Sequence, residues 1–523
     1  MQQLSALDAS FLYMETASQT GHVASLALYD PSSGPEGSMY ERVRRTLLER
    51  IPALTPMRRR LVDVPLGLDH PYWVEDPNFD IDFHLRHIAV PPPGDEHQLA
   101  ELVARLHSRP LDRTMPLWEL YVIEGLQSGL VAVYTKLHHC TIDGVAGVEL
   151  TAALLDTEPS PAGKRPTSPR RDLDPLPTQF EMLARGAFGL AFTPGRTLQF
   201  GLRLARGLAR ARELGPWVNA TGVVPIANML GLNRLPVVRD LLARVQTDVE
   251  DASPIPQTPA PQTPFNRPIT PRRSLAFVTL PLDGVKVVKR AFDTTVNDVV
   301  LAVCAHALRR YLERRGELPD SPLVAMVPVS VRSEAEKKTF SNRVTTVLTE
   351  LATDEPDPAQ RLLRIQTAMK SAKRMREAMP ADLLQDFTQF QSTLIAGRAA
   401  RVIARTWIAD RLNPPFNVTI SNVPGPRDPL YLRGARLEAM YPVSIVLDGQ
   451  GLNMTVISYR DRLDFGLTAC REVVPDLWEI TEGLKEGLAA LVHKAETAAP
   501  PAALVRAATA RRARRGRKTR REA

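Results

Sequence analysis

The residues best suited to chemistry in this sequence are two adjacent histidines, His138 and His139, followed by an Asp-Gly pair at Asp143 and Gly144. An imidazole titrates close to neutral pH, so it can remove a proton from an alcohol while that alcohol attacks a carbonyl carbon. Asp143 is expected to hold the loop by pairing with an arginine or with backbone donors. Gly144 permits a close backbone approach because it has no Cβ. The segment therefore predicts a general-base site.

Only one of the two histidines is expected to act on a substrate. The residues from Leu130 to His139 are typical of a strand, and neighbouring residues of a strand point to opposite faces. We predict that His139, at the mouth of the turn, is the base and that His138 supports it. The alternative is a pair of core histidines followed by an ordinary Asp-Gly turn.

The sequence gives less support to other chemistry at this segment. A metal site is not expected, because neither a Cys/His cluster nor an HExxH spacing elsewhere completes a set of ligands. Cys140 is more typical of a small buried residue than of a nucleophile. Cys140, Cys304 and Cys470 lie far apart without a CxxC pair, so neither a disulfide framework nor a zinc site is indicated.

The elements that must position the histidines form a mixed α/β pattern. The stretch from His22 to Asp30 predicts a strand, and helices are predicted from Ser38 to Arg50 and around His97 to Ser108. Helical character returns at Val145, so the histidines lie between a strand and a helix. We interpret residues 1–157 as one domain that carries the motif.

Residues 158–273 differ in composition from the segments on both sides. Proline-rich stretches enclose a helical, arginine-rich middle, which is typical of a linker that carries an insertion. Within it, leucine and alanine side chains share one predicted helical face, whereas Arg203, Arg206 and Arg210 share another. Such a basic amphipathic helix is suited to an anionic membrane surface.

Residues 274–498 repeat the α/β alternation and predict a second domain. Strands are expected at LAFVTLPL and LVAMVPVSV, with a helix between them in TVNDVVLAVCAHALRRYLERRG. Toward the end, YPVSIVL, LNMTVISY and DFGLTA predict an antiparallel meander before a final helix from Pro475. With 523 residues, 44% of them hydrophobic and 24% charged, the chain is long enough for two large folded domains and the insertion.

The net charge of +8 belongs to the last segment of the chain. Residues 503–523 contain nine Lys or Arg and one Glu, which accounts for the whole excess, and residues 499–523 are interpreted as a basic disordered tail. Nucleic-acid binding is not expected, because the tail lacks interleaved aromatic residues and a recognised reader module. Attachment to an anionic membrane or lipid-droplet surface is expected instead, with a merely solvated tail as the alternative.

No segment predicts secretion or a membrane span. The N-terminus, MQQLSALDASFLYME, lacks a basic region followed by an apolar core, and no run of about eighteen apolar residues occurs. We therefore expect a cytoplasmic protein that associates peripherally with the inner face of the membrane or with lipid droplets.

The segment HHCTIDG resembles the HHxxxDG motif of CoA-dependent acyltransferases, and the chain around it resembles the bacterial wax ester synthase/diacylglycerol acyltransferase family. The similarity runs almost from end to end, because LSALDASFLYME, PLDRTMPLWEL, TVNDVVLA and SNVPGP occur in family order. Several motifs together are much more specific than HHxxxDG alone. One departure is Ser341 before Asn342, where the family often has a glycine.

The resemblance implies a fold and an activity. The fold would be two domains like chloramphenicol acetyltransferase, with a tunnel between them that admits the thioester from one side and the acceptor from the other. The activity would be transfer of a long-chain acyl group from acyl-CoA, as co-substrate, to diacylglycerol, which makes triacylglycerol without a further cofactor. The alternatives are a wax ester synthase that uses long-chain alcohols, and a catalytically weak protein that binds lipid surfaces.

The resemblance also implies roles for individual residues. His139 would be the catalytic base, with His138 and Asp143 in support. Asn297 would line the active site, where its amide is a candidate donor to the developing oxyanion; capping of a helix that starts at Asp298 is the alternative. A three-residue motif would contribute to acceptor binding or chain-length fit: Pro116, Leu117 and Trp118. Without the resemblance, the tryptophan is more typical of a core aromatic than of a ligand contact.

Overall fold

The computed structural model describes residues 1–34, 37–141, 153–159, 176–186, 260–330, 344–378 and 414–497. Outside these ranges lie Asp143 and Gly144, the helix predicted from Val145, the arginine-rich middle of the insertion, Ser341 with Asn342, and the basic tail. The interpretations of those segments stay predictions. We call residues 260–497 the C-terminal half.

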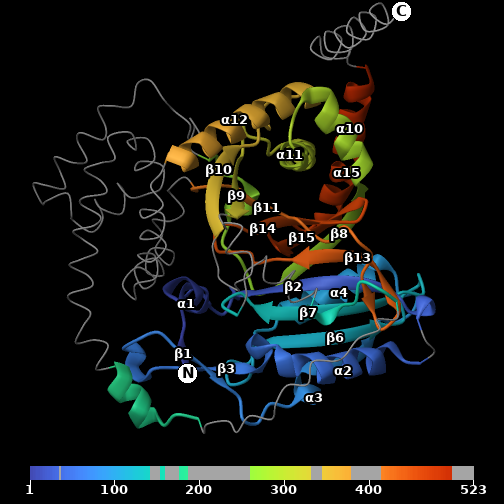
Figure 1. The fold of residues 1–523 in the computed structure, drawn as a ribbon. Helices are drawn as coiled ribbons and strands as arrows, with labels where there is room; N and C mark the ends of the chain where they lie inside the picture. Colours follow the sequence, from blue (N-terminus) through green and yellow to red (C-terminus); the bar gives the residue numbers. More distant parts are fainter. Residues whose placement is uncertain are drawn as a thin grey trace, which may run out of the picture.

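The first sheet holds six strands in the order β12-β13-β2-β7-β6-β5 (Figure 1). The strand β7 pairs antiparallel with both β2 and β6, so it is central among the N-terminal strands. The strands predicted from His22 and before His139 are confirmed. The bounds are β2 (His22–Asp30), β5 (Leu85–Ala89), β6 (Trp118–Glu124), β7 (Val131–His138), β12 (Tyr431–Leu432) and β13 (Ala435–Val443).

Helices and a small sheet surround the first sheet. The two predicted helices are confirmed to within one residue at each end, because their sequences carry clear caps. Ser38 caps the first of them, and Asp95 with Gln98 forms a capping box for the second. The helices are α1 (Ala6–Tyr13), α2 (Met39–Arg50), α3 (Ile81–His84) and α4 (Glu96–His107), and a separate three-stranded sheet comprises β1 (Gln2–Gln3), β4 (Tyr72–Glu75) and β3 (Arg59–Val62).

The second sheet, from the C-terminal half, holds six strands in the order β10-β9-β11-β14-β15-β8. The strand β11 runs parallel to both β9 and β14, whereas the other neighbours are antiparallel. The strands predicted at LAFVTLPL and LVAMVPVSV are confirmed. The bounds are β8 (Arg273–Pro281), β9 (Val324–Ser330), β10 (Val344–Glu350), β11 (Val418–Val423), β14 (Leu452–Tyr459) and β15 (Arg462–Cys470).

The helices of the C-terminal half cover the side of the second sheet that faces away from the first sheet (Figure 1). They are α10 (Leu282–Phe292), α11 (Val296–Arg314), α12 (Pro358–Ala378) and α15 (Leu477–Thr497). Most of α11 is buried in the core. No single helix among the described residues is long and apolar enough to cross a membrane, and only α10 and α11 taken together, across a 106° bend, reach that composition.

The prediction of a three-stranded antiparallel meander near the C-terminus is wrong for its first strand, β13. The strands β14 and β15 form an antiparallel hairpin as expected, but β13 pairs with β2 of the first sheet (Figure 1). It packs closely on the second sheet: Met440 N–H donates to the Asp464 carboxyl at 2.9 Å, and a Cβ on Gly466 would lie 1.8 Å from the Pro442 carbonyl oxygen. A strand that lies between two sheets forms its backbone hydrogen bonds with the strands of only one of them. Its pattern of buried side chains is the same whichever sheet it joins, so the sequence does not predict the sheet.

Candidate active site

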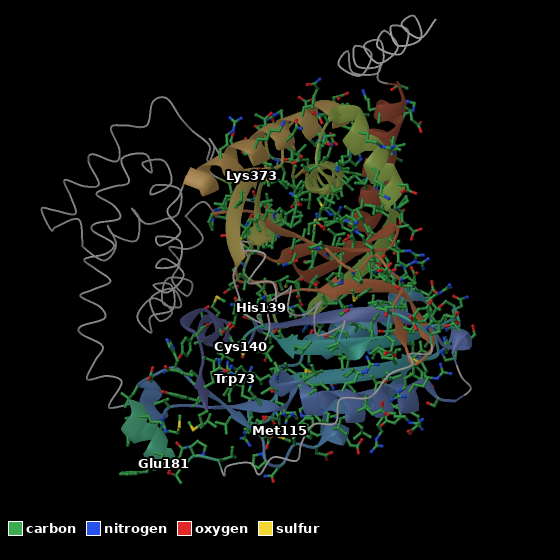
Figure 2. The ribbon with its side chains drawn as sticks, viewed as in Figure 1. Trp73, Met115, His139, Cys140, Glu181 and Lys373 are labelled. Carbon is green, nitrogen blue, oxygen red and sulfur yellow. The ribbon has the colours of Figure 1, made fainter. Side chains whose placement is uncertain are left out.

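The two histidines lie where β7 ends and the chain turns. His138 is the last residue of β7, and Thr141 N–H donates to its carbonyl at 2.9 Å. The His139 N–H donates to the Gly21 carbonyl at 2.8 Å, just before β2 begins. Figure 2 shows His139 at this end of the first sheet, toward the second sheet. His139 is half-buried and His138 is buried, so the two neighbours have different surroundings.

Both ring nitrogens of His138 have partners. The Nδ1 atom accepts a hydrogen bond from Cys140 N–H at 3.2 Å, so Nε2 carries the proton of the neutral imidazole. The Nε2–H group donates to Oε1 of Glu15 at 3.1 Å. With both nitrogens engaged, His138 is placed to support the turn rather than to exchange protons with a substrate.

The Glu15 carboxylate is the acceptor at the centre of this arrangement. Oε1 also accepts from Gly21 N–H at 2.7 Å, and Oε2 accepts from the Arg113 guanidinium at 2.5 Å. Burial by itself would raise the pKa of Glu15, but the hydrogen bonds that its carboxylate accepts from His138, the Gly21 N–H and Arg113 outweigh it and lower the pKa below its ordinary value. Glu15 is therefore ionised at neutral pH.

The ring of Phe11 stacks on the ring of His139. The two centroids are 4.0 Å apart and the planes meet at 19°. This contact restrains the orientation of the imidazole plane. Because the lone pair and the N–H of an imidazole lie in the ring plane, they point away from Phe11. The helix α1 and the residues just after it therefore contact both histidines, through Phe11 and Glu15.

The motif predicted to bind the acceptor lies beside the histidines, where β6 begins. The Leu117 carbonyl accepts from His138 N–H at 3.0 Å, and the Pro116 carbonyl accepts from Trp118 N–H at 2.8 Å. Trp118 is 1% exposed, and its Nε1–H donates to the Met57 carbonyl at 2.7 Å. The structure thus places Trp118 in the core, and a role of the motif in acceptor binding stays a prediction.

Asn297 lies in the first turn of α11, and its predicted alternative role as a cap is wrong. The helix begins at Val296 with Thr295 as its N-cap. The Thr295 hydroxyl accepts from Asp298 N–H at 3.1 Å, and the Asp298 carboxylate accepts from Thr295 N–H at 2.8 Å, so these two residues already satisfy the helix end. Asn297 is half-buried, and its Oδ1 accepts from Asn422 Nδ2 at 3.4 Å.

Sequence reasoning did not find four residues that contact the histidines: Phe11, Glu15, Gly21 and Arg113. Phe11 and Glu15 belong to LSALDASFLYME, and Arg113 belongs to PLDRTMPLWEL, so the signal was their presence in segments already recognised as motifs. Glu15 lies 98 positions before Arg113 and 123 positions before His138 in the chain. Local sequence patterns do not reveal contacts over such separations.

Cys140 does not have the surroundings of a nucleophile. Burial, and secondarily the charge of Asp8, raises the pKa of its thiol well above the usual value, and a protonated thiol attacks carbonyls poorly. Cys140, Cys304 and Cys470 are all buried and free. Within the part of the chain that the structure describes, no three His, Cys, Asp or Glu residues are grouped so as to hold a metal ion.

Further buried polar side chains lie near His138, on β7 and on the neighbouring strand β2. The Lys136 ammonium is fully buried and lies 2.8 Å from the Glu119 carboxylate. The His22 Nε2 lies 2.5 Å from the His107 carbonyl oxygen. Burial, with the Lys136 charge in the same direction, lowers the pKa of His22 to about 3 and that of His107 well below its ordinary value. Both histidines are therefore neutral at pH 7.

Acidification is expected to destabilise the fold through these neutral histidines. An unfolded chain protonates its histidines near pH 6.5, but the folded protein keeps them neutral, so the unfolded state binds more protons below that pH. Their contribution is complete above pH 6.5 and is lost as the pH falls. The free energy of unfolding should decrease by about 2 kcal/mol between pH 7 and pH 5 from His22 alone, as urea unfolding at the two pH values would measure.

The buried carboxyl of Asp464 acts in the opposite direction. Burial raises its pKa to about 6, so the folded protein takes up a proton that the unfolded chain does not, and stability recovers by about 1 kcal/mol between pH 6 and pH 5. Comparison with His22→Gln separates the two effects, because only the histidine contribution is removed. An identical pH dependence in the wild type and in His22→Gln would contradict the assignment to His22.

Comparison with known families identifies two matching models. One is described as the wax ester synthase/diacylglycerol acyltransferase catalytic domain and matches residues 4–300; the other, the C-terminal domain of that family, matches residues 340–492. A Mycobacterium tuberculosis protein named "putative diacylglycerol O-acyltransferase" is 38% identical over 94% of this chain and 90% of its own length. The O-acyltransferase WSD of Acinetobacter baylyi is 33% identical over 93% of this chain and 96% of its own length.

Solved structures share the fold. The wax ester synthase/diacylglycerol acyltransferase from Marinobacter aquaeolei VT8 has a TM-score of 0.66 and 31% identity, with 95% of this chain and all of that chain covered. The first condensation domain of the calcium-dependent antibiotic synthetase has a TM-score of 0.53 over 95% of this chain and 96% of its own, and at 16% identity it bears on the fold alone. The predicted mixed α/β fold with two acetyltransferase-like halves is confirmed, and the tunnel stays a prediction.

Proposed function

Because this chain belongs to the wax ester synthase/diacylglycerol acyltransferase family, we propose that it transfers a long-chain acyl group from acyl-CoA to the hydroxyl of diacylglycerol, with His139 as the general base. The observation that carries the proposal is the difference between the two histidines. His138 is buried with both nitrogens engaged, whereas His139 is half-buried at the turn, toward the second sheet (Figure 2).

The proposed transfer proceeds without a covalent intermediate on the protein. Neutral His139 takes the proton of the acceptor hydroxyl as its oxygen attacks the thioester carbonyl. The new C–O bond forms, the C–S bond then breaks, and the departing CoA sulfur receives the proton from the imidazolium. Because both substrates are held in one complex, the attack is effectively intramolecular. The protonated thiol of Cys140 takes no part.

The developing oxyanion needs hydrogen-bond donors, and we assign this role to Asn297. Its Oδ1 accepts from Asn422, so its amide N–H groups are directed elsewhere. Loss of one such donor typically costs about 10²- to 10³-fold in kcat. Asp143 and Gly144 keep their proposed role of shaping the turn after His139.

Diacylglycerol is proposed as the acceptor because relatives at 38% and 36% identity carry the name of diacylglycerol O-acyltransferases. A long-chain alcohol, which would give a wax ester, is the alternative. Peripheral binding to an anionic membrane or lipid-droplet surface belongs to the proposal, because the acceptor is insoluble and the chain ends in nine Lys or Arg within residues 503–523.

The acceptor is tested by offering diolein and hexadecanol separately with oleoyl-CoA and identifying the lipid products by mass spectrometry. We expect triacylglycerol as the main product. Formation of wax ester without triacylglycerol would show that the acceptor is a long-chain alcohol, while the acyl-transfer reaction itself would stand. Absence of acyl transfer to either acceptor from folded protein would contradict the proposed function.

A further inference from the structure

We propose that Glu15 is a positioning residue that sets the orientation of both histidines in the active site. The inference rests on the proposed function, in which His139 is the base. Glu15 follows α1 and meets Gly21, Arg113 and His138, three residues from separate segments of the chain. Three steps connect its carboxylate to the base.

The first step is the control of the His138 tautomer. The Cys140 N–H occupies Nδ1, and the Glu15 carboxylate accepts the proton on Nε2, so the two contacts together favour one tautomer and one ring orientation. A carboxylate is a stronger acceptor for this N–H than a neutral group. Because Cys140 follows His139 directly, the orientation of the His138 ring also constrains the backbone on the far side of the base.

The second step passes through Gly21. Its N–H donates to Glu15 at 2.7 Å, and its carbonyl accepts from the His139 N–H at 2.8 Å. The fit is close, because a Cβ on Gly21 would lie 2.8 Å from His138 Nε2 and 2.9 Å from the Phe11 carbonyl oxygen. A shift of the Glu15 carboxylate would therefore displace the backbone that holds His139.

The third step is the anchoring of Glu15 and α1 by Arg113. Two guanidinium nitrogens donate to Oε2 of Glu15: Nη2 at 2.5 Å and Nε at 3.2 Å. Nη2 also donates to the Leu12 carbonyl at 2.9 Å. The same contact satisfies a carbonyl in the last turn of α1, the helix that carries Phe11. Arg113 thus fixes both the carboxylate and the aromatic ring that stacks on His139.

These contacts require a carboxylate at position 15. Its two oxygens accept hydrogen bonds from Gly21, His138 and, twice, Arg113. A glutamine amide has one acceptor oxygen and one NH2 donor. If the NH2 group took the place of Oε2, it would face the donors of Arg113. If it took the place of Oε1, it would face the N–H groups of Gly21 and His138.

The kinetic test is Glu15→Gln, assayed with oleoyl-CoA and diolein. We expect kcat to fall on the order of 100-fold, as for a small misplacement of a catalytic group, while the KM for oleoyl-CoA stays close to wild type. Glu15→Asp keeps the charge and should recover part of the loss. The control Glu101→Gln breaks an exposed ion pair with Arg105 on α4 and should leave kcat unchanged. A wild-type kcat in Glu15→Gln, or a rise in KM alone, would overturn the proposal.

Labelling with diethyl pyrocarbonate tests the positioning without acyl transfer. The reagent modifies neutral imidazole nitrogens, so in the wild type we expect His139 to react faster than His138, as mass spectrometry of peptides would show. In Glu15→Gln, His138 should become reactive. If the wild type transfers no acyl group, the proposed function fails while the labelling still decides the positioning role. Equal labelling of the two histidines in the wild type would overturn the positioning role even if Glu15→Gln does not fold.

Discussion

Replacement of His139 with alanine is expected to lower kcat for acyl transfer roughly 10²- to 10⁴-fold, because the acceptor hydroxyl then has no base at the site of attack. The KM for oleoyl-CoA and the midpoint of urea unfolding should stay close to the wild-type values. His139 is half-buried at a turn, and the contacts that the substitution removes include its stack with Phe11; a side chain outside the packed core usually costs less stability than a core side chain. Steady-state kinetics with diolein as acceptor measure the effect.

Two further histidine variants make this result specific. His138→Ala should lose both activity and stability, because it removes one buried and one partly buried hydrogen bond and leaves the Cys140 N–H and the Glu15 carboxylate without that partner. His87→Ala, on β5, breaks an exposed contact with Glu124 on β6 and a ring stack with Tyr40, away from the proposed base, and should leave kcat unchanged. A wild-type kcat in His139→Ala would exclude His139 as the base.

Trp118→Ala is expected to lower the free energy of unfolding by about 3–5 kcal/mol, the usual cost of removing a large aromatic side chain from a packed core. The side chain is 1% exposed, its ring stacks on His84 with centroids 4.4 Å apart, and its Nε1–H donates to the Met57 carbonyl at 2.7 Å. Substitution leaves a cavity and an unsatisfied buried carbonyl, and both destabilise. Urea unfolding gives the difference.

Two variants test whether this loss comes from burial. Phe180→Ala removes an aromatic ring that is 79% exposed and should change the free energy of unfolding by less than about 0.5 kcal/mol. Trp118→Phe keeps much of the packing but loses the hydrogen bond to Met57, so its effect should fall between those of the other two. Unchanged stability in Trp118→Ala, with a raised KM for diolein, would instead support a role of Trp118 in acceptor binding.

Local sequence signals predicted many of the individual elements correctly. The helix after Ser38 and the helix between Asp95 and Ser108 were found because their caps and apolar spacing agree with the buried faces that form. The N-cap of α11 was also readable, since Thr295 and Asp298 have capping-box spacing, and assignment of the cap to Asn297 overlooked it. Such signals act within one turn of helix and do not depend on the rest of the fold.

Pairings between distant segments could not be predicted in the same way. The pattern of β13 fits either sheet, and nothing in it indicates that the strand pairs with β2, which lies near the other end of the chain. The same holds for the active site. Spacing and chemistry pointed to His139, but Glu15 lies 123 positions from His138, and nothing local relates the two. The residues that position the base are therefore visible only once the chain is folded.

The most direct test of the central claim is a single-turnover experiment with radiolabelled oleoyl-CoA and enzyme in excess, with and without diolein. Direct transfer by His139 predicts that free CoA and labelled triacylglycerol appear together and in equal amounts, and that no CoA is released without the acceptor. Release of CoA equal to the amount of thioester supplied in the absence of diolein, with label bound to the protein, would contradict direct attack and indicate an acyl-enzyme.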